Sequence, residues 1–79
     1  PNPMNDVINL GILATEEITL NIQLCDAVGK LINTVAENET YAEGVHHLSL
    51  PSSALRSGVY WIRIGDGVSE RILKFLKSN

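Results

Sequence analysis

The chain has 79 residues, of which 44% are hydrophobic and 5% aromatic, with one cysteine and a formal net charge of -3. A chain this short buries only about 60% of its unfolded surface, so it forms one domain with a single, mainly aliphatic core. One cysteine excludes an internal disulfide and a cysteine zinc site, so packing alone must hold the fold.

Acidic and basic residues are unevenly distributed along the chain. Residues 1–55 carry seven acidic residues and one lysine, a net charge of -6, whereas residues 56–79 carry five basic and two acidic residues, a net charge of +3. We expect no nucleic-acid partner, because phosphates need a broad cationic face. No apolar run approaches the roughly 18 residues of a membrane span. Without an initiator methionine or signal peptide, residues 1–79 are interpreted as a module excised from a larger protein.

The first half of the chain predicts three strands in series. Segments 7–13 and 18–25 alternate apolar and polar residues with a period of two, which is typical of half-buried strands. Glu16-Glu17 marks the turn between them, and residues 26–29 mark the next turn. A third strand is expected over 30–36, followed by a long polar loop over 37–44.

The second half predicts three further strands. A fourth strand over 45–50 ends at Pro51, because proline cannot continue the hydrogen-bonded ladder. Residues 54–57 suggest one helical turn, and strands over 59–64 and 68–77 are separated by a Gly-Asp-Gly turn. An extended segment over Pro1–Pro3 would raise the number of strands to seven.

These elements predict an all-β fold, an antiparallel immunoglobulin-like or fibronectin type III-like β-sandwich of six or seven strands. No ten-residue stretch keeps a period of 3.6, and turn signals recur every 8–12 residues, as expected of such a sandwich. The inward faces of the strands predict a core that includes Leu20, Ile22, Leu48, Tyr60 and Ile62.

Few residues suggest a metal or catalytic site. His46 and His47 are adjacent on a strand and therefore point to opposite faces, so they cannot chelate one ion, and we expect one at the core edge and one in solvent. Cys25 lies in no Cys-His motif and is expected to be a free surface or edge thiol. Trp61 is either an exposed aromatic that contacts a sugar or a protein, or a ring packed beneath a long side chain.

Catalysis is not expected from this chain. Its serines lie in no nucleophile elbow, and its carboxylates are scattered over turns in a domain too small to enclose a pocket. We predict no enzyme activity, no metal and no cofactor.

Four short motifs follow one another along the chain. Pro1-Asn2-Pro3 opens it, Asp26-Ala27-Val28-Gly29-Lys30 lies in the middle, Leu55-Arg56-Ser57-Gly58-Val59-Tyr60 follows, and Lys74-Phe75-Leu76-Lys77 closes it. In this order they resemble the C-terminal sorting domain of type IX secretion (Por secretion system) cargo, type A class. One departure is Ile72-Leu73, where such tails often carry another lysine.

Each motif residue also has a structural interpretation. Gly29 and Gly58 suit turns that need a positive φ, and Tyr60 suits a tyrosine corner, with its ring in the core and its hydroxyl bonded to backbone. Lys74 and Lys77 suit an edge strand, where charge blocks aggregation between sheets.

The resemblance implies a function. The domain would be a non-catalytic signal that directs its cargo across the outer membrane to the cell surface or medium, after transit through the periplasm. Its partners would be outer-membrane translocon components and, in many cargoes, a sortase-like peptidase that removes the domain. We expect a monomer whose last strand offers its sheet edge to the translocon. The residues carried over as the sorting motif are Pro1, Asn2, Pro3, Asp26, Gly29, Gly58, Tyr60, Lys74, Phe75, Leu76 and Lys77.

The alternative is a β-sandwich module that binds carbohydrate or an adhesion partner, or a passive spacer in a secreted multidomain protein. Carbohydrate modules usually expose several aromatic rings, and only Trp61 and Tyr41 are candidates here.

Overall fold

The computed structural model describes residues 7–52 and 55–78, and these form six strands without a helix. The prediction of an all-β fold is confirmed. The strands are β1 (Val7–Ala14), β2 (Ile18–Asp26), β3 (Leu31–Tyr41), β4 (Gly44–Pro51), β5 (Gly58–Gly65) and β6 (Glu70–Lys77).

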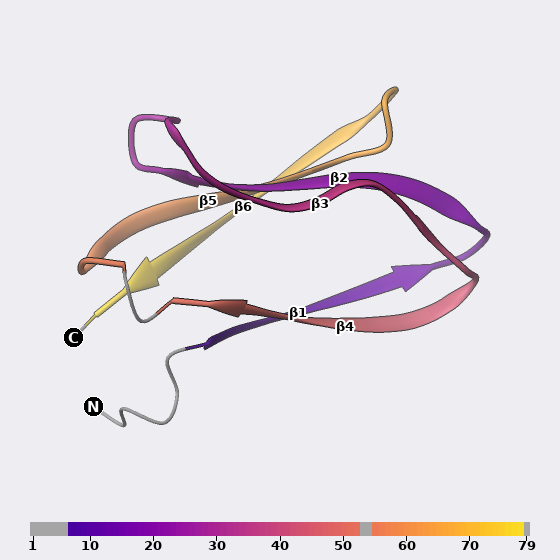
Figure 1. Cartoon of the computed structure of the whole chain (residues 1–79), viewed down its shortest axis with the longest axis horizontal. Helices are drawn as coiled ribbons and strands as arrows, with labels where there is room; N and C mark the ends of the chain where they lie inside the picture. Colours follow the sequence, from indigo (N-terminus) through magenta and orange to yellow (C-terminus); the bar gives the residue numbers. More distant parts are fainter. Residues whose placement is uncertain (1–6, 53–54, 79) are drawn as a thin grey trace.

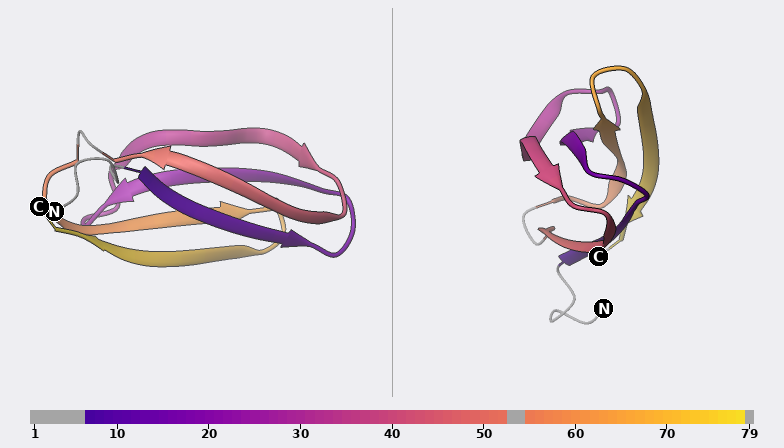
Figure 2. Two further views of the ribbon diagram at one scale, coloured as in Figure 1. Left: turned by 90° about the horizontal axis from the view of Figure 1, so that it is seen from below. Right: turned by 90° about the vertical axis from the view of Figure 1, so that its right-hand side faces the viewer.

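The strands form two antiparallel sheets that face each other (Figures 1 and 2). A small sheet pairs β1 with β4, and a larger one has the order β3-β2-β5-β6. β2 and β5 are the two inner strands, because each pairs with a neighbour on both sides. The predicted sandwich is therefore confirmed with six strands. The expected seventh, Pro1–Pro3, lies outside the described residues.

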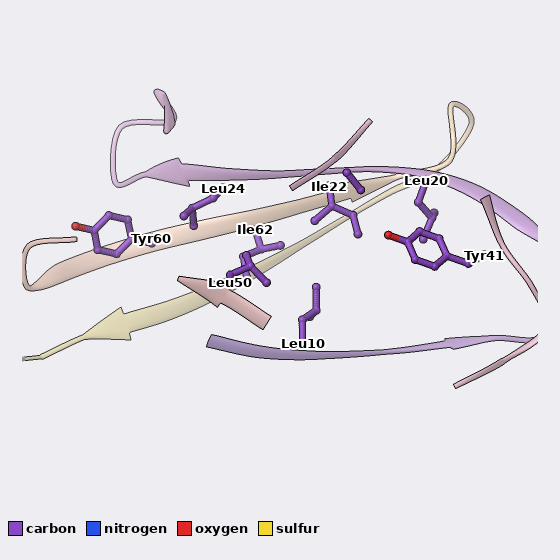
Figure 3. Close-up of a cluster of buried hydrophobic side chains, with 9 residues drawn as sticks. Leu10, Leu20, Ile22, Leu24, Tyr41, Leu50, Tyr60 and Ile62 are labelled. Carbon is purple, nitrogen blue, oxygen red and sulfur yellow. The ribbon is translucent and has the colours of Figure 1, made fainter. Parts of the chain in front are cut away.

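The core fills the space between the two sheets (Figure 3). Leu10 and Leu50 of the small sheet face Ile22 and Ile62 of the larger one, and Ile22 is fully buried. Full burial of one such side chain contributes about 1.5–3 kcal/mol. Four of the five predicted core residues are buried, but Leu48 is only half-buried, because it packs against the buried cluster from its margin.

Two local predictions were wrong. Residues 37–41, expected in a loop, continue β3 as far as Tyr41. Their polar side chains are accommodated because β3 is an edge strand, where Thr40 Oγ1 lies 2.9 Å from Thr19 Oγ1 and Asn38 N donates to Asn21 Oδ1 at 2.9 Å. The helical turn expected over 54–57 is not formed by its described part, residues 55–57, and residue 54 lies outside the described residues.

The elongated sandwich has two distinct ends (Figure 1). One end, called here the motif end, consists of residues 26–30, 55–60 and 74–78, and β1 begins beside it. The opposite end consists of the turns at residues 15–17, 42–43 and 66–69.

Candidate recognition surface

The turn between β2 and β3 is organised by the carboxylate of Asp26. Asp26 Oδ1 accepts hydrogen bonds from Val28 N at 3.0 Å and Lys30 N at 2.9 Å, and Gly29 N donates to Asp26 O at 3.0 Å. Gly29 has φ +90°, a backbone conformation that residues other than glycine rarely adopt. The Asp and Gly of this motif therefore fix one turn shape, as their structural interpretation predicted.

The start of β5 carries a tyrosine corner. The Tyr60 ring is buried, and its hydroxyl donates to Arg56 O at 2.6 Å, which confirms the predicted backbone bond. The ring stacks on Phe75 of β6, with centroids 5.4 Å apart and planes inclined by 21°. Gly58 has the positive φ that the structural interpretation expected, +154°, but it is the first residue of β5 rather than part of the preceding turn. The connection from β4 is thus anchored to the last strand through aromatic packing.

The last motif residues alternate between the two faces of β6. Phe75 points inward, whereas Leu76 is 70% exposed. Lys74 Nζ lies 5.9 Å from the centroid of the Trp61 ring, within the range of a cation–π contact. Lys77 Nζ donates to the carbonyl of the buried Ser52 at 3.0 Å. Lys77 is therefore more than an edge charge, because it ties the end of the large sheet to the exit of the small one.

Strand register brings these separate motifs together. Tyr60 lies opposite Asp26 on one side and opposite Phe75 on the other. Lys74 lies one row further along β6, opposite Trp61, and Lys77 lies opposite Gly58. Motifs that are far apart in the sequence thus lie side by side on neighbouring strands at the motif end (Figure 1). Pro1, Asn2 and Pro3 lie outside the described residues.

Charge also separates along the molecule. The motif end carries Lys30, Arg56, Lys74 and Lys77 against Asp26. The turns of the opposite end carry acidic residues and no basic one, namely Glu16, Glu17, Glu43 and Asp66. The uneven charge of the sequence is therefore a polarity of the folded domain.

Residues 1–78 match the sequence profile of the family described as the secretion system C-terminal sorting domain. The match covers nearly the whole chain. The chain belongs to this family of sorting domains. No match was found among curated proteins or among solved structures.

Family membership gives the sorting domain its function. It is a C-terminal signal for type IX secretion, so it interacts with the type IX machinery and directs export to the cell surface or medium. The resemblance predicted from the motifs is confirmed, and the carbohydrate-binding, adhesion and spacer alternatives gain no support. Domains of this family are generally non-catalytic. Across residues 7–52 and 55–78 there is no helix of the length and hydrophobicity that a membrane span requires.

The two histidines lie outside the sorting motif, and they differ in burial. His46 is half-buried, with Nε2 2.6 Å from Ala42 O and its ring edge-on to Tyr41 at 5.1 Å, whereas His47 is exposed, so their predicted placement on opposite faces is confirmed. No group of three potential metal ligands occurs in the part of the chain that the structure describes.

Cys25 corrects one prediction, because its thiol is buried, with only 2% of the residue exposed. It lies on the outer face of the large sheet opposite Trp61, whose Nε1 donates to Ala27 O at 3.4 Å. The indole thus stays over the turn and, with Val28, borders a shallow groove of about 400 Å³ above the thiol. Of the two roles considered for Trp61, packing beside a long side chain is the one observed, because Lys74 lies over its ring.

Two side chains, those of Tyr41 and Asp66, have shifted pKa values. Burial, followed by the nearby charge of Glu39, raises the pKa of Tyr41 above its usual 10.0. Backbone hydrogen bonds from Ser69 and Val68 lower the pKa of Asp66 below 3.8. Neither group belongs to the motif end, so these shifts describe the opposite end of the domain.

Sequence reasoning missed two acceptors and one contact at the motif end. The carbonyl of Ser52 accepts a hydrogen bond from Lys77, and the carbonyl of Arg56 accepts one from Tyr60. Every residue has a backbone carbonyl, so the residue type does not indicate which one acts as the acceptor. The contact between Lys74 and Trp61 depends on the β5–β6 register. A four-residue turn over 66–69 sets that register, rather than the three-residue turn expected.

Proposed function

We propose that the type IX translocon binds the motif end of the folded domain, and that the described motif residues act together as one recognition surface. The observation that carries this proposal is the row Asp26–Tyr60–Phe75, which joins three sequence motifs across neighbouring strands. A translocon must recognise many cargoes through the same small domain. A surface built from three strands supplies both shape and charge for that purpose.

Within this surface we assign two kinds of role. Asp26, Gly29, Gly58, Tyr60 and Phe75 hold the shape, because their polar groups and rings are used in contacts inside the domain. Lys74 and Leu76 present charge and apolar surface at the end of the edge strand, and Lys77 has both roles, because its ammonium group also donates to Ser52 O. Pro1, Asn2 and Pro3 are assigned to the same signal on the sequence motif alone.

The wider pathway is part of the proposal. The domain forms the C-terminal end, residues 1–79, of a larger secreted cargo, crosses the periplasm folded and monomeric, and contributes no catalysis or cofactor. Outer-membrane translocon components bind it, and a sortase-like peptidase removes it from the cargo. The generally non-catalytic nature of the family supports the first part of this assignment.

Reporter fusions test the recognition surface. A fluorescent protein with an inner-membrane signal peptide and this domain at its C-terminus is produced in a strain with a type IX apparatus, and surface and medium fluorescence are measured. In a motif-end variant, Lys74→Glu and Lys77→Glu reverse two charges. In a matched control at the opposite end, Glu17→Lys and Glu43→Lys also reverse two charges, in turns whose residues are exposed.

We expect the unmodified fusion and the control to be exported and the motif-end variant to remain in the periplasm. Thermal unfolding of each purified domain confirms that the variants fold. Export of a folded motif-end variant at the level of the control would show that recognition does not use this surface. Retention of the unmodified fusion would contradict the sorting function of this chain.

A further inference from the structure

The two edge strands of the large sheet differ in how well they are protected against pairing with another strand. β3 has three register irregularities against β2, and Asn38 has φ +49°, so its outer edge is twisted and interrupted. β6 pairs with β5 in unbroken register over all eight of its residues and contains no proline. Proteins usually interrupt exposed edges to prevent strand addition. β6 keeps an edge on which another strand can pair.

A cleft lined by apolar and polar residues lies beside the first half of β6. Its volume is about 660 Å³, and it separates β6 from β1, whose own outer edge is also unpaired among the described strands. Leu10 and Ile12 line it from β1, and Leu73, 37% exposed, lines it from β6. The cleft therefore offers apolar side chains from two neighbouring strand edges, which suit the inward side chains of one extended segment.

Charge indicates which kind of segment fits. β6 carries Arg71, Lys74 and Lys77 against one acid, Glu70, whose Oε2 already accepts from Arg63 Nη2 at 3.0 Å. Like charges opposite each other destabilise a strand pair, so a second copy of β6, itself at +2, is a poor partner. An acidic strand is a good one. Its acidic residues belong towards Lys74, because Glu16 and Asp66 border the far end of the cleft.

We propose that the domain is bound by strand addition at β6: an extended, acidic segment of a translocon protein pairs with the outer edge of β6 and places alternate apolar side chains in the cleft between β6 and β1. This inference rests on the proposed function and extends it. The motif end supplies the orienting charge, and the cleft supplies the apolar anchor.

One pair of variants separates the cleft from the rest of the strand. Leu73→Gln introduces an amide on the face that lines the cleft, whereas Ile72→Gln makes the same change one residue earlier, on the outer face opposite Arg63. Neither changes the charge. In the reporter fusion we expect Leu73→Gln to reduce export at least tenfold and Ile72→Gln to change it less than twofold, with both purified domains folded by NMR.

A synthetic peptide tests the binding mode directly. Titration of the isotope-labelled domain with a ten-residue peptide of valine alternating with threonine and glutamate should shift amide signals of residues 10–14 and 70–77. The same peptide with lysine in place of glutamate should bind at least tenfold more weakly.

Several results would overturn the inference: equal export of the two glutamine variants, peptide-induced shifts on β3, equal binding of the two peptides, no binding, or a domain that dimerises through β6. If Leu73→Gln exports normally while the Lys74 and Lys77 variant is retained, strand addition is wrong and the proposed recognition surface stands. If the unmodified fusion is retained, the proposed function itself fails.

Discussion

At both the motif end and the opposite end of this sandwich, an aspartate side chain stabilises a turn, but the two ends differ in charge and in aromatic packing. Asp26 Oδ1 accepts two backbone N–H groups at one end, and Asp66 Oδ1 accepts those of Val68 and Ser69, at 2.8 and 2.7 Å, at the other. Folding therefore explains an aspartate turn at either end. Folding does not explain why four of the six basic residues, Lys30, Arg56, Lys74 and Lys77, lie at the motif end, beside the stacked rings of Tyr60 and Phe75.

Some residues of the motif end are therefore required for folding, and others, we propose, are recognised by a partner. A change that lowers stability equally at both ends identifies a folding device. A change that lowers export only when made at the motif end identifies recognition.

The largest expected effect is that of Tyr60→Ala. Removing a buried aromatic ring costs about 3–5 kcal/mol, and here the stack on Phe75 and the bond to Arg56 O are lost with it. Urea denaturation should show a domain that is largely unfolded in buffer. Leu76→Ala, at an exposed position of the same surface, should change the unfolding free energy by less than about 0.5 kcal/mol. Comparable losses from the two changes would show that the motif does not divide into shape and contact residues.

Next in size is Asp26→Ala, which removes two hydrogen bonds from the β2–β3 turn. We expect a loss of about 1–2 kcal/mol in the free energy of unfolding. Asp66→Ala removes the equivalent pair and should also lower the melting temperature. Export of reporter fusions should fall for Asp26→Ala alone. A parallel fall for Asp66→Ala would mean that export follows stability rather than the motif end.

A smaller effect distinguishes the two tyrosines. Tyr60→Phe removes the hydroxyl that donates to Arg56 O at 2.6 Å and should cost about 1 kcal/mol. Tyr41→Phe should be close to neutral, because no hydrogen bond to the Tyr41 hydroxyl occurs within residues 7–52 and 55–78. Both values come from chemical denaturation of the purified variants. Equal costs would remove the tyrosine corner as the explanation for the position of Tyr60.

Most of the fold could be predicted from the sequence because the inner faces repeat with a period of two. The strand from Ile18 onward alternates cleanly, and Leu20 and Ile22 are buried as that pattern requires. Residues 37–41 gave no such signal, since on the edge strand β3 tertiary pairing rather than hydrophobic burial keeps polar residues extended.

The candidate site was predictable as a set of residues but not as a surface. The motif order identified the family, and Tyr60 was expected to bond to backbone, as it does. The cleft beside Leu73 and the burial of Cys25 depend on strand order and on neighbours across the sheet. Neither is a local property of the sequence, so neither could be predicted without the fold.

The smallest expected effect is the pH dependence that Asp66 gives to the opposite end. Backbone bonds from Ser69 and Val68 favour its carboxylate and lower its pKa in the folded state, so it stabilises the fold above the unfolded pKa near 3.8. That contribution is lost as the pH falls through the lower, folded pKa. The melting temperatures of the unmodified domain and of Asp66→Ala should therefore differ at pH 6 and converge towards pH 2 to 3, while Asp26→Ala retains the acid response due to Asp66. A difference between the unmodified domain and Asp66→Ala that stays constant over this range would show that the turn at residues 66–69 does not depend on the ionised carboxylate.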